Sequence, residues 1–144
     1  MMTAEKINEM KVTLPALSVN EGVARALVGA FCAQLNPTLE EIQDLKCAVS
    51  EAVTNCIVHA YRGKGGPIYI SVALYADRSI TISVRDRGCG IPDVALARQP
   101  LYTTNTDGER SGMGFSVMET FTDRLTVRSR IGVGTGVTMK KRLL

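Results

Sequence analysis

The sequence has few of the patterns that identify a membrane, secreted or metal-binding protein. No apolar run among its 144 residues approaches the roughly 18 residues that a membrane span needs. The N-terminal segment is polar, so no signal peptide is visible, and we expect a cytoplasmic location. There is a single histidine and no CxxC pair, so a usual zinc set cannot be completed. The net charge of +3 is too small to indicate a nucleic-acid-binding protein.

What the sequence does contain fits one folded domain with its own hydrophobic core. Apolar residues make up 45% of the chain and charged residues 22%, and neither figure suggests disorder. We therefore expect residues 1–144 to form a single domain. Its cysteines are expected to be reduced thiols, and they stand at Cys32, Cys47, Cys56 and Cys89.

Two segments follow the 3.6-residue period of an amphipathic helix, and each starts with a capping-box pattern. Ser18 with Glu21 opens the first helix, which is expected to end near residue 35, before an Asn-Pro pair. Thr38 with Glu41 opens the second helix, which is expected to run to about residue 61. Both helices place their apolar residues on one face, as core-facing helices do.

Beyond residue 67 the apolar period changes to 2, which predicts two β-hairpins separated by a long loop at 88–114. So long a loop in a small domain tends to be functional. The fold class predicted is α+β, a two-layer sandwich of one mixed, mostly antiparallel sheet with helices on one face. The expected strands lie at 9–14, 68–75, 80–84, 125–129 and 135–139, with a third helix at 113–121.

Glu51 and Asn55 stand four residues apart on the second predicted helix, at the border of its apolar face. Carboxylate and amide oxygens are hard ligands that suit Mg²⁺, and a carboxylate can also activate a hydroxyl or a water. Taken alone, these two residues are better explained as an ordinary solvated polar pair.

Asp86 ends a predicted strand with the same parity as the apolar residues of 80–84, so its side chain is expected to point toward the core. A buried carboxylate needs hydrogen-bond donors, and the amino group of a purine is one candidate. Gly88 and Gly90 allow backbone to approach a flat or charged ligand closely. A turn in which the aspartate bonds its own backbone is the alternative interpretation.

Residues 111–115 (S-G-M-G-F) form a glycine-rich turn that opens the third predicted helix. Free N–H groups at a helix N-terminus bind anions, and Arg98 and Arg110 are placed to pair with phosphate oxygens. A flexible loop capped by Ser111 explains the same residues. Gly-Thr-Gly at 134–136 offers a threonine hydroxyl to a ligand, although a glycine-containing β-turn explains this segment equally well.

Four motifs of this sequence, in their order and spacing, resemble those of the GHKL superfamily of ATPases and kinases, which share the Bergerat ATP-binding fold. They are E-x-x-x-N, D-x-G-x-G, S-G-M-G-F and G-T-G. The resemblance covers nearly the whole chain, from about residue 8 to 141. Within the superfamily the chain is most similar to the sporulation anti-sigma factors that are also serine-protein kinases. The segments that carry this similarity are ALSVNE at 16–21, VSEAVTN at 49–55, ARQPL at 97–101 and ERSGMGF at 109–115.

The resemblance implies a role for individual residues. Glu51 would be the catalytic general base, Asn55 would coordinate Mg²⁺, and Asp86 would accept from the adenine amino group with Thr135 beside it. Residues 92–110 would form the ATP lid. The implied nucleotide-binding set is Asn55, Asp86, Gly88, Gly90, Ile91, Arg110, Ser111, Gly112, Met113, Gly114, Phe115 and Thr135.

The resemblance also implies protein partners. These are a sporulation sigma factor that the protein binds and inhibits, and a separate anti-anti-sigma factor whose serine is phosphorylated. A general base suits a serine acceptor, because the serine hydroxyl must lose a proton. The single histidine, His59, is expected to be structural. A homodimer is implied, with the N-terminal strand and first helix as a candidate interface, and no direct nucleic acid or membrane is expected. The alternatives are a stress-response type of anti-sigma serine kinase and a non-catalytic, ATP-gated sigma-binding module.

Glu21 and Arg25 lie one turn apart on the first predicted helix, away from its apolar face, and are candidate contacts for a partner protein. A plain i,i+4 salt bridge is the alternative for this pair. The C-terminal hairpin is basic but lacks the interleaved aromatic residues that base stacking needs. A solvated outer face of the sheet is therefore expected there.

Overall fold

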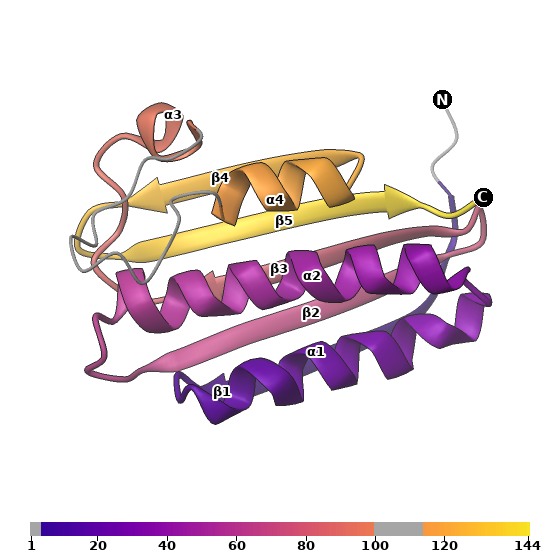
Figure 1. The fold of residues 1–144 in the computed structure, drawn as a ribbon, viewed down its shortest axis with the longest axis horizontal. Coiled ribbons are helices and arrows are strands. Elements are labelled where there is room, and N and C mark those ends of the chain that lie inside the picture. The colour runs from indigo at the N-terminus through magenta and orange to yellow at the C-terminus, as the bar shows by residue number, and fades with distance from the viewer. Residues whose placement is uncertain (1–3, 100–113) are drawn as a thin grey trace.

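The chain is described by a computed structural model covering residues 4–99 and 114–144. One five-stranded sheet carries three helices on a single face (Figure 1). The strands are β1 (Lys6–Pro15), β2 (Pro67–Tyr75), β3 (Ser79–Asp86), β4 (Arg124–Arg130) and β5 (Gly134–Arg142). The helices are α1 (Val19–Cys32), α2 (Leu39–Asn55), the single turn α3 (Val94–Ala97) and α4 (Gly114–Phe121).

The strands lie in the order β1-β2-β3-β5-β4, and all four of these pairings are antiparallel. Helices α1, α2 and α4 lie side by side across the same face of the sheet (Figure 1). The predicted two-layer α+β sandwich is therefore confirmed. None of these three helices covers the opposite face, which we call the open face of the sheet.

Of the two predicted capping boxes, one forms and one does not. At α2 the Thr38 hydroxyl accepts from the backbone N–H of Glu41 at 3.1 Å, and the Glu41 carboxylate accepts from the N–H of Thr38 at 2.9 Å. At α1 the prediction is wrong, because Ser18 has helical backbone angles and its side chain caps nothing. The carboxylate of Glu21 instead accepts a hydrogen bond from Arg25, one turn further along.

The two long helices end in different ways. After α1 the chain makes a 3-10 turn at Ala33–Leu35, and Asn36 takes a left-handed conformation with φ of 51° directly before Pro37. After α2 the helix widens into a π-helical turn at Cys56–Ala60, so the predicted end near residue 61 is correct but the widening is not foreseen. Such π-helical turns are frequent at functional sites.

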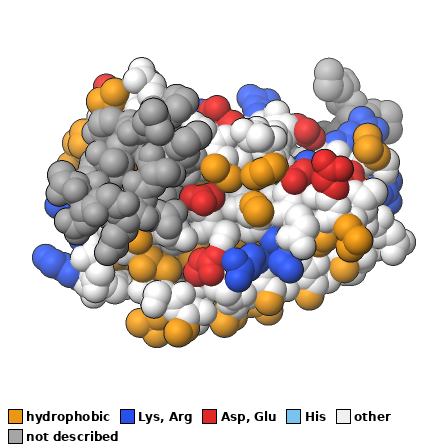
Figure 2. Space-filling model, viewed as in Figure 1, with side chains coloured by type: hydrophobic (Ala, Val, Ile, Leu, Met, Phe, Trp, Pro, Cys, Tyr) orange, Lys and Arg blue, Asp and Glu red, His pale blue; other side chains and the backbone are white. Residues whose placement is uncertain are grey.

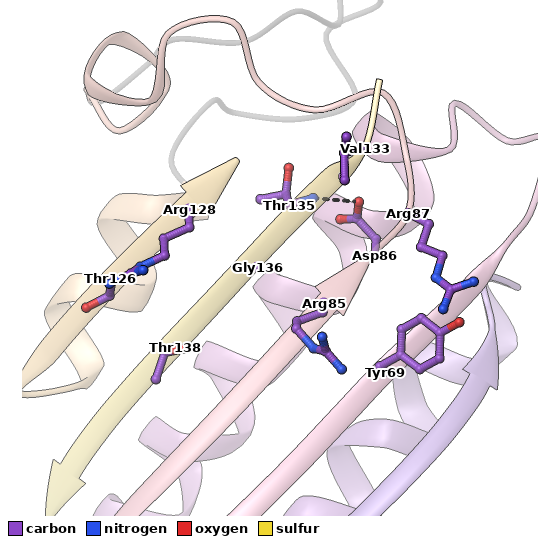
Figure 3. Close-up of a pocket in the computed structure, with 11 residues that line it drawn as sticks. Tyr69, Arg85, Asp86, Arg87, Thr126, Arg128, Val133, Thr135, Gly136 and Thr138 are labelled. Atoms are coloured by element: carbon purple, nitrogen blue, oxygen red, sulfur yellow. Dashed lines mark hydrogen bonds between the residues drawn. The ribbon is translucent and has the colours of Figure 1, made fainter. Parts of the chain in front are cut away.

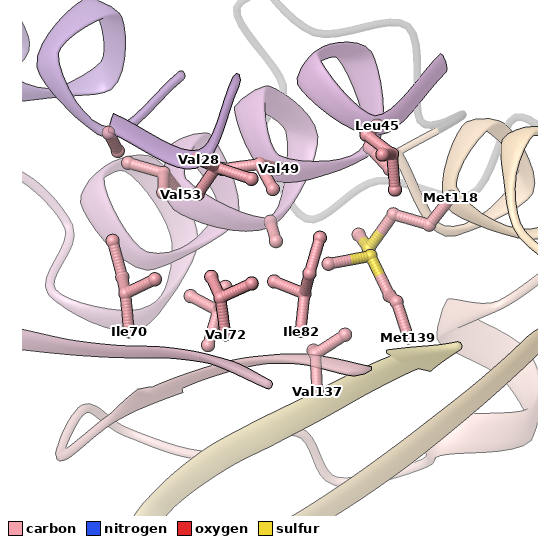
Figure 4. Packing of buried hydrophobic residues seen from close by; sticks show 14 of the residues in the cluster. Val28, Leu45, Val49, Val53, Ile70, Val72, Ile82, Met118, Val137 and Met139 are labelled. Atoms are coloured by element: carbon pink, nitrogen blue, oxygen red, sulfur yellow. The ribbon is translucent and has the colours of Figure 1, made fainter. Parts of the chain in front are cut away.

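The hydrophobic core fills the space between the helices and the sheet (Figure 4). The even-numbered residues of β2 and β3 point into it, as the period-2 pattern predicts, and Val72 and Ile82 are 0% and 1% exposed. From the helix layer, Val49 and Val53 of α2 cover these strand residues. Burial of such side chains stabilises the fold by roughly 1.5–3 kcal/mol each.

The long segment expected to be loop contains one short helix in its described part. Asp93 starts α3, since its carboxylate accepts from the backbone N–H of Leu96 at 3.0 Å. Residues 100–113 lie outside the described residues. No helix in the two described ranges is long and apolar enough to cross a membrane.

Candidate functional site

The fold brings Glu51, Asn55 and Gly114 together, although they come from different parts of the chain. Glu51 and Asn55 lie on adjacent turns at the C-terminal end of α2, as their spacing predicts. A Cβ atom placed on Gly114 would lie 3.2 Å from Asn55 Oδ1 and 3.3 Å from Glu51 Oε2. The first residue of α4 thus lies directly against both polar side chains, and a larger residue there would make an unusually tight contact with them.

This contact gives one small region three chemical properties. The first turn of a helix presents N–H groups without intrahelical partners and a partial positive charge, which favour an anion such as phosphate. The Asn55 amide oxygen is a hard ligand, and the Glu51 carboxylate is a proton acceptor. The described residues contain no cluster of three or more His, Cys, Asp or Glu side chains that could hold a metal ion alone. The donor set fits a cation such as Mg²⁺, which is commonly held by one or two protein oxygens together with phosphates and waters.

Asp86 forms the second part of the site, at the end of β3. Its Oδ1 accepts from the backbone N–H of Gly88 at 2.9 Å and from that of Thr135 at 3.1 Å (Figure 3). The first bond is the local turn that sequence reasoning kept as an alternative. The second bond links β3 to β5 and fixes the carboxylate in place.

Cys56 connects this carboxylate to the helix layer. The thiol is 3% exposed and follows directly after Asn55, at the start of the π-helical turn. Burial raises the pKa of the Cys56 thiol well above its ordinary value, and the nearby Asp86 carboxylate raises it further. The thiol is therefore neutral beside Asp86.

Ser129 of β4 completes the network around Thr135. Its Oγ lies 2.8 Å from Thr135 Oγ1, 3.2 Å from the carbonyl oxygen of Gly134, and accepts from the N–H of Ile91 at 2.7 Å. Sequence reasoning did not single out Ser129. The available signal was its parity, because Ser129 continues the inward-facing series of Leu125 and Val127, just as Asp86 continues that of β3.

Gly88 and Gly90 have a structural reason to be glycine. A Cβ on Gly88 would lie 2.5 Å from the backbone oxygen of Ala60, at the end of the π-helical turn. Gly90 has φ of +82°, and a Cβ there would collide with the backbone of Arg130. Both glycines let the segment after β3 press against neighbouring backbone.

Tyr61 holds the same segment from the other side and is a second residue that sequence reasoning missed. Its hydroxyl donates to the carbonyl oxygen of Pro67 at 2.5 Å and accepts from the N–H of Arg87 at 2.7 Å. Nothing in the local sequence pattern distinguishes this tyrosine from an ordinary core residue.

Of the remaining predicted site residues, some are described by the structure and some are not. Phe115 is buried at 8% exposure in the hydrophobic core, so its observed contacts are packing contacts. Arg98 makes an ion pair with Glu119 of α4, which occupies a side chain expected to face phosphate. Four predicted phosphate-binding residues and most of the predicted lid lie outside the described residues, namely Arg110, Ser111, Gly112 and Met113.

Glu21 and Arg25 form the i,i+4 salt bridge that sequence reasoning kept as the alternative. Arg25 Nη1 lies 3.0 Å from Glu21 Oε1, and the same nitrogen lies 3.5 Å from Ser50 Oγ of α2. The pair belongs to α1, and the helix-covered face of the molecule shows both acidic and basic side chains (Figure 2). Both side chains remain partly exposed, at 45% for Arg25 and 26% for Glu21.

Comparison with known proteins defines the class first. Residues 14–141 match the family described as "Histidine kinase-like ATPase domain". The match covers most of the chain, so the protein belongs to the class with this ATPase domain.

Individual relatives within the class identify a narrower family. The chain is 52% identical over 135 residues to the anti-sigma F factor of Clostridium acetobutylicum, covering 94% of each chain. It is 56% identical over 134 residues to that of Caldanaerobacter subterraneus subsp. tengcongensis, covering 93% of each. The chain therefore belongs to the anti-sigma F factor family, which confirms the resemblance drawn from its motifs.

Solved structures support the fold. The chain matches the crystal structure of the RsbU and RsbW domains of a Mycobacterium tuberculosis protein with a TM-score of 0.69 and 24% identity. That match covers 95% of this chain and 33% of the other, so the chain corresponds to about a third of the longer protein. A histidine kinase domain from Erythrobacter litoralis matches with a TM-score of 0.56 and 17% identity, covering 85% of this chain and 61% of that one.

Proposed function

We propose that this protein binds Mg-ATP and phosphorylates a serine of a separate anti-anti-sigma factor, and that it binds and inhibits a sporulation sigma factor. The observation that carries the proposal is the contact of Gly114 with Glu51 and Asn55, which joins a helix N-terminus to a base and a metal ligand. Membership of the anti-sigma F factor family supports the sigma-factor part.

Adenine would bind at Asp86. A carboxylate offers about four acceptor positions. The N–H groups of Gly88 and Thr135 both bond to Oδ1, which leaves acceptor positions on Oδ2 for the exocyclic amino group of the base. A ligand donor at this position would complete the hydrogen bonding of a partly buried carboxylate, which is the condition for a stable site.

The triphosphate would bind where α4 begins. Asn55 Oδ1 would hold Mg²⁺, which neutralises phosphate charge when bound. Gly114 would let the phosphates approach the first turn of α4, and the residues before it would complete the phosphate contacts. Those residues are Arg110, Ser111, Gly112 and Met113, and we propose residues 92–110 as the lid over the nucleotide.

Phosphoryl transfer would then depend on Glu51 as the base. The serine oxygen forms a bond to the γ-phosphorus while the bond from that phosphorus to the β–γ bridging oxygen breaks, leaving ADP. The serine proton moves to the Glu51 carboxylate. Positioning and charge neutralisation dominate such reactions, and a positioned base contributes typically about 10²–10⁴-fold.

Partner binding would use surfaces outside the proposed nucleotide site. The exposed parts of Glu21 and Arg25 on α1 are the proposed sigma-factor contact, and β1 with α1 is the proposed interface of a homodimer. We propose a cytoplasmic location, where both protein partners are available.

The decisive experiment is single-turnover transfer of labelled γ-phosphate from ATP to the purified anti-anti-sigma factor. We expect wild-type protein to label a serine, and Glu51→Gln to lose transfer by about 10²-fold or more while still binding ATP. Undiminished transfer by Glu51→Gln would remove Glu51 as the base. A wild-type protein that retains the sigma factor with ATP but labels no serine would instead be a non-catalytic, ATP-gated binding module.

A further inference from the structure

The open face of the sheet carries a hollow of about 450 Å³ (Figure 3). It is separate from the contact of Gly114 with Glu51 and Asn55, which lies in the helix layer on the other side of the sheet. Its lining does include Asp86 and Thr135 of the proposed adenine site, at one end of the hollow. The side chains that shape it come from four strands: Tyr69 of β2, Arg85 of β3, Thr138 of β5 and Arg128 of β4, with Arg87 just beyond β3.

The hollow exists because of one glycine in the strand register. Tyr69 pairs with Arg85, Arg85 with Gly136, and Gly136 with Arg128, so these four residues form one row across the sheet. Gly136 has no side chain, so a gap is left between the two arginines. At the usual strand spacing of about 4.8 Å, Arg85 and Arg128 stand roughly 10 Å apart at their Cα atoms, on either side of this gap.

Aromatic contact orients two of the three arginines. The guanidinium carbon of Arg85 lies 5.6 Å from the centre of the Tyr69 ring, and that of Arg87 lies 5.1 Å from it (Figure 3). Cation–π contacts at these distances are favourable and leave guanidinium N–H groups available. The ring therefore acts as a support that holds two charges at one end of the hollow.

One carboxylate, that of Asp86, also lines the hollow, but its Oδ1 already accepts the backbone N–H groups of Gly88 and Thr135. Among the described residues, none of Arg85, Arg87 and Arg128 takes part in a salt bridge. The helix-covered face differs, since it mixes both signs of charge (Figure 2). Next to the row of arginines, Ser83 and Thr138 place their hydroxyl oxygens 3.4 Å apart. Guanidinium groups together with hydroxyl donors are a typical setting for carboxylates, which arginine binds in a bidentate way.

We infer that this hollow is a docking site for an acidic segment of a partner protein, whose carboxylate side chains enter between Arg85 and Arg128. Charge complementarity identifies the partner. A second copy of this chain would bring one basic face against another, which repulsion disfavours. Nucleic acid lacks a stacking platform here, because the one ring among the described lining residues, Tyr69, is already covered by two guanidinium groups.

The hollow borders the proposed adenine site at Asp86 and Thr135. Arg85, Arg128 and Gly136 take no part in the proposed nucleotide binding, and the test needs no nucleotide, so the two proposals fail separately. The test uses the full chain without nucleotide and a fluorescein-labelled octaglutamate peptide, with binding followed by anisotropy at about 0.1 M salt, where only charges within about 10 Å interact strongly. We expect saturable binding of one peptide per chain. Arg85→Ala and Arg128→Ala should each weaken it about ten-fold or more, since hydrogen bonds to charged groups are worth about 1.5–3 kcal/mol.

Two further variants separate a shaped site from general charge attraction. Gly136→Val keeps every charge and fills the gap; a Cβ there would lie 3.4 Å from Arg85 Cγ, an ordinary contact. We expect it to weaken binding as much as loss of an arginine. Lys64→Ala removes one positive charge from the exposed turn before β2 and should change affinity less than about two-fold.

Several outcomes would overturn the inference. They are an unchanged affinity for Gly136→Val, an equal loss for Lys64→Ala, or no binding by the wild-type chain. Tighter binding of an eight-nucleotide single-stranded DNA with the same arginine dependence would identify nucleic acid instead. Amide NMR shifts of the wild-type chain provide a check that needs no variant: the peptide should shift Gly136 and Thr138 and leave Asn55 unmoved.

Discussion

Ser129 Oγ of β4 lies 2.8 Å from Thr135 Oγ1 of β5, and the same oxygen accepts the N–H of Ile91 at 2.7 Å. The Ser129 hydroxyl therefore links Ile91 to Thr135, and the backbone N–H of Thr135 in turn donates to Asp86. We therefore predict that Ser129 is a positioning residue for the proposed adenine site, because it contacts Thr135 and would act through it rather than through the nucleotide.

Replacing Ser129 tests this role. We expect Ser129→Ala to leave the N–H of Ile91 without its acceptor and to raise the KM for ATP about three- to ten-fold, with kcat at saturating ATP nearly unchanged. Steady-state phosphotransfer kinetics measure both constants. Ser129→Thr keeps the hydroxyl and should restore most of the affinity. An equal loss in both variants would mean that the position matters only for packing.

Asp86 should decide nucleotide affinity itself. Asp86→Asn replaces one carboxylate oxygen with an amide N–H₂, which removes acceptor capacity and puts a donor next to the donor of adenine. We expect ATP affinity to fall about 100-fold or more in titration calorimetry. Asp77→Asn, in the exposed turn between β2 and β3, is the matched control and should leave affinity unchanged. Unchanged affinity in Asp86→Asn would place adenine elsewhere.

Gly114 should be intolerant of any side chain. In Gly114→Ala the new methyl group would lie 3.2 Å from Asn55 Oδ1 and 3.3 Å from Glu51 Oε2, tighter than most real contacts. We expect phosphotransfer to fall about ten-fold or more, because small displacements of positioning groups reduce rates strongly. Gly22→Ala on α1 is the control, since its methyl would meet only Arg25 Nη2 at 3.8 Å. Equal activity in the two variants would argue against a tight contact at Gly114.

The cysteines should differ in reactivity. Burial raises the pKa of Cys32 to about 12, and burial with the adjacent Asp86 raises that of Cys56, so neither forms much thiolate at pH 8. Cys47 is exposed. We expect iodoacetamide at pH 8 to label Cys47 first in the native protein and to spare Cys32 and Cys56, with all four labelled in urea. Peptide mass mapping checks this, and rapid native labelling of Cys56 would contradict its buried contact with Asp86.

Glu41 should contribute to acid sensitivity. The N–H groups of Thr38 and Leu144 hydrogen bond to its carboxylate and hold its pKa below the ordinary value of 4.5. The unfolded chain then binds the proton more readily, so this stabilisation is complete above about pH 4.5 and is lost as pH falls through the lower folded pKa. Glu41→Gln keeps a capping side chain that cannot titrate.

We therefore expect urea unfolding of Glu41→Gln to show a shallower loss of stability than wild type below about pH 4.5. Above that pH the two proteins should differ by a nearly constant amount. Parallel curves across the whole acid range would show that Glu41 does not titrate differently in the two states.

Sequence periodicity predicted most of the fold, because burial on one face forces a regular pattern on each element. Periodicity could not choose between competing local hydrogen bonds. Ser18 and Thr38 carry the same capping pattern, but the Glu21 carboxylate accepts from Arg25, whereas that of Glu41 accepts from the backbone N–H of Thr38. It also could not foresee the π-helical turn at Cys56–Ala60, because the helical apolar pattern continues through those residues.

At the candidate site, parity placed Asp86 on the core side, and the same argument applied to Ser129 would have found it. Helical spacing placed Glu51 beside Asn55. Their meeting with Gly114 needed the three-dimensional fold, because α2 and α4 are far apart in sequence and lie side by side only in the folded helix layer. The hollow at Gly136 also required the register of four strands, which no local pattern specifies.

The strand order has a consequence for how the chain folds. β2 and β3 are joined by a tight turn and pair directly, so they can form a hairpin from local contacts alone. β1 can pair with β2 only after the chain between them, which contains both α1 and α2, has closed as a loop. β5 can pair with β3 and β4 only when the chain as far as Arg142 is present. Closing long loops slows such pairings. We therefore expect the β2–β3 hairpin to be the kinetic nucleus, and hydrogen exchange during refolding to protect Val72 and Ile82 before the amides of β1.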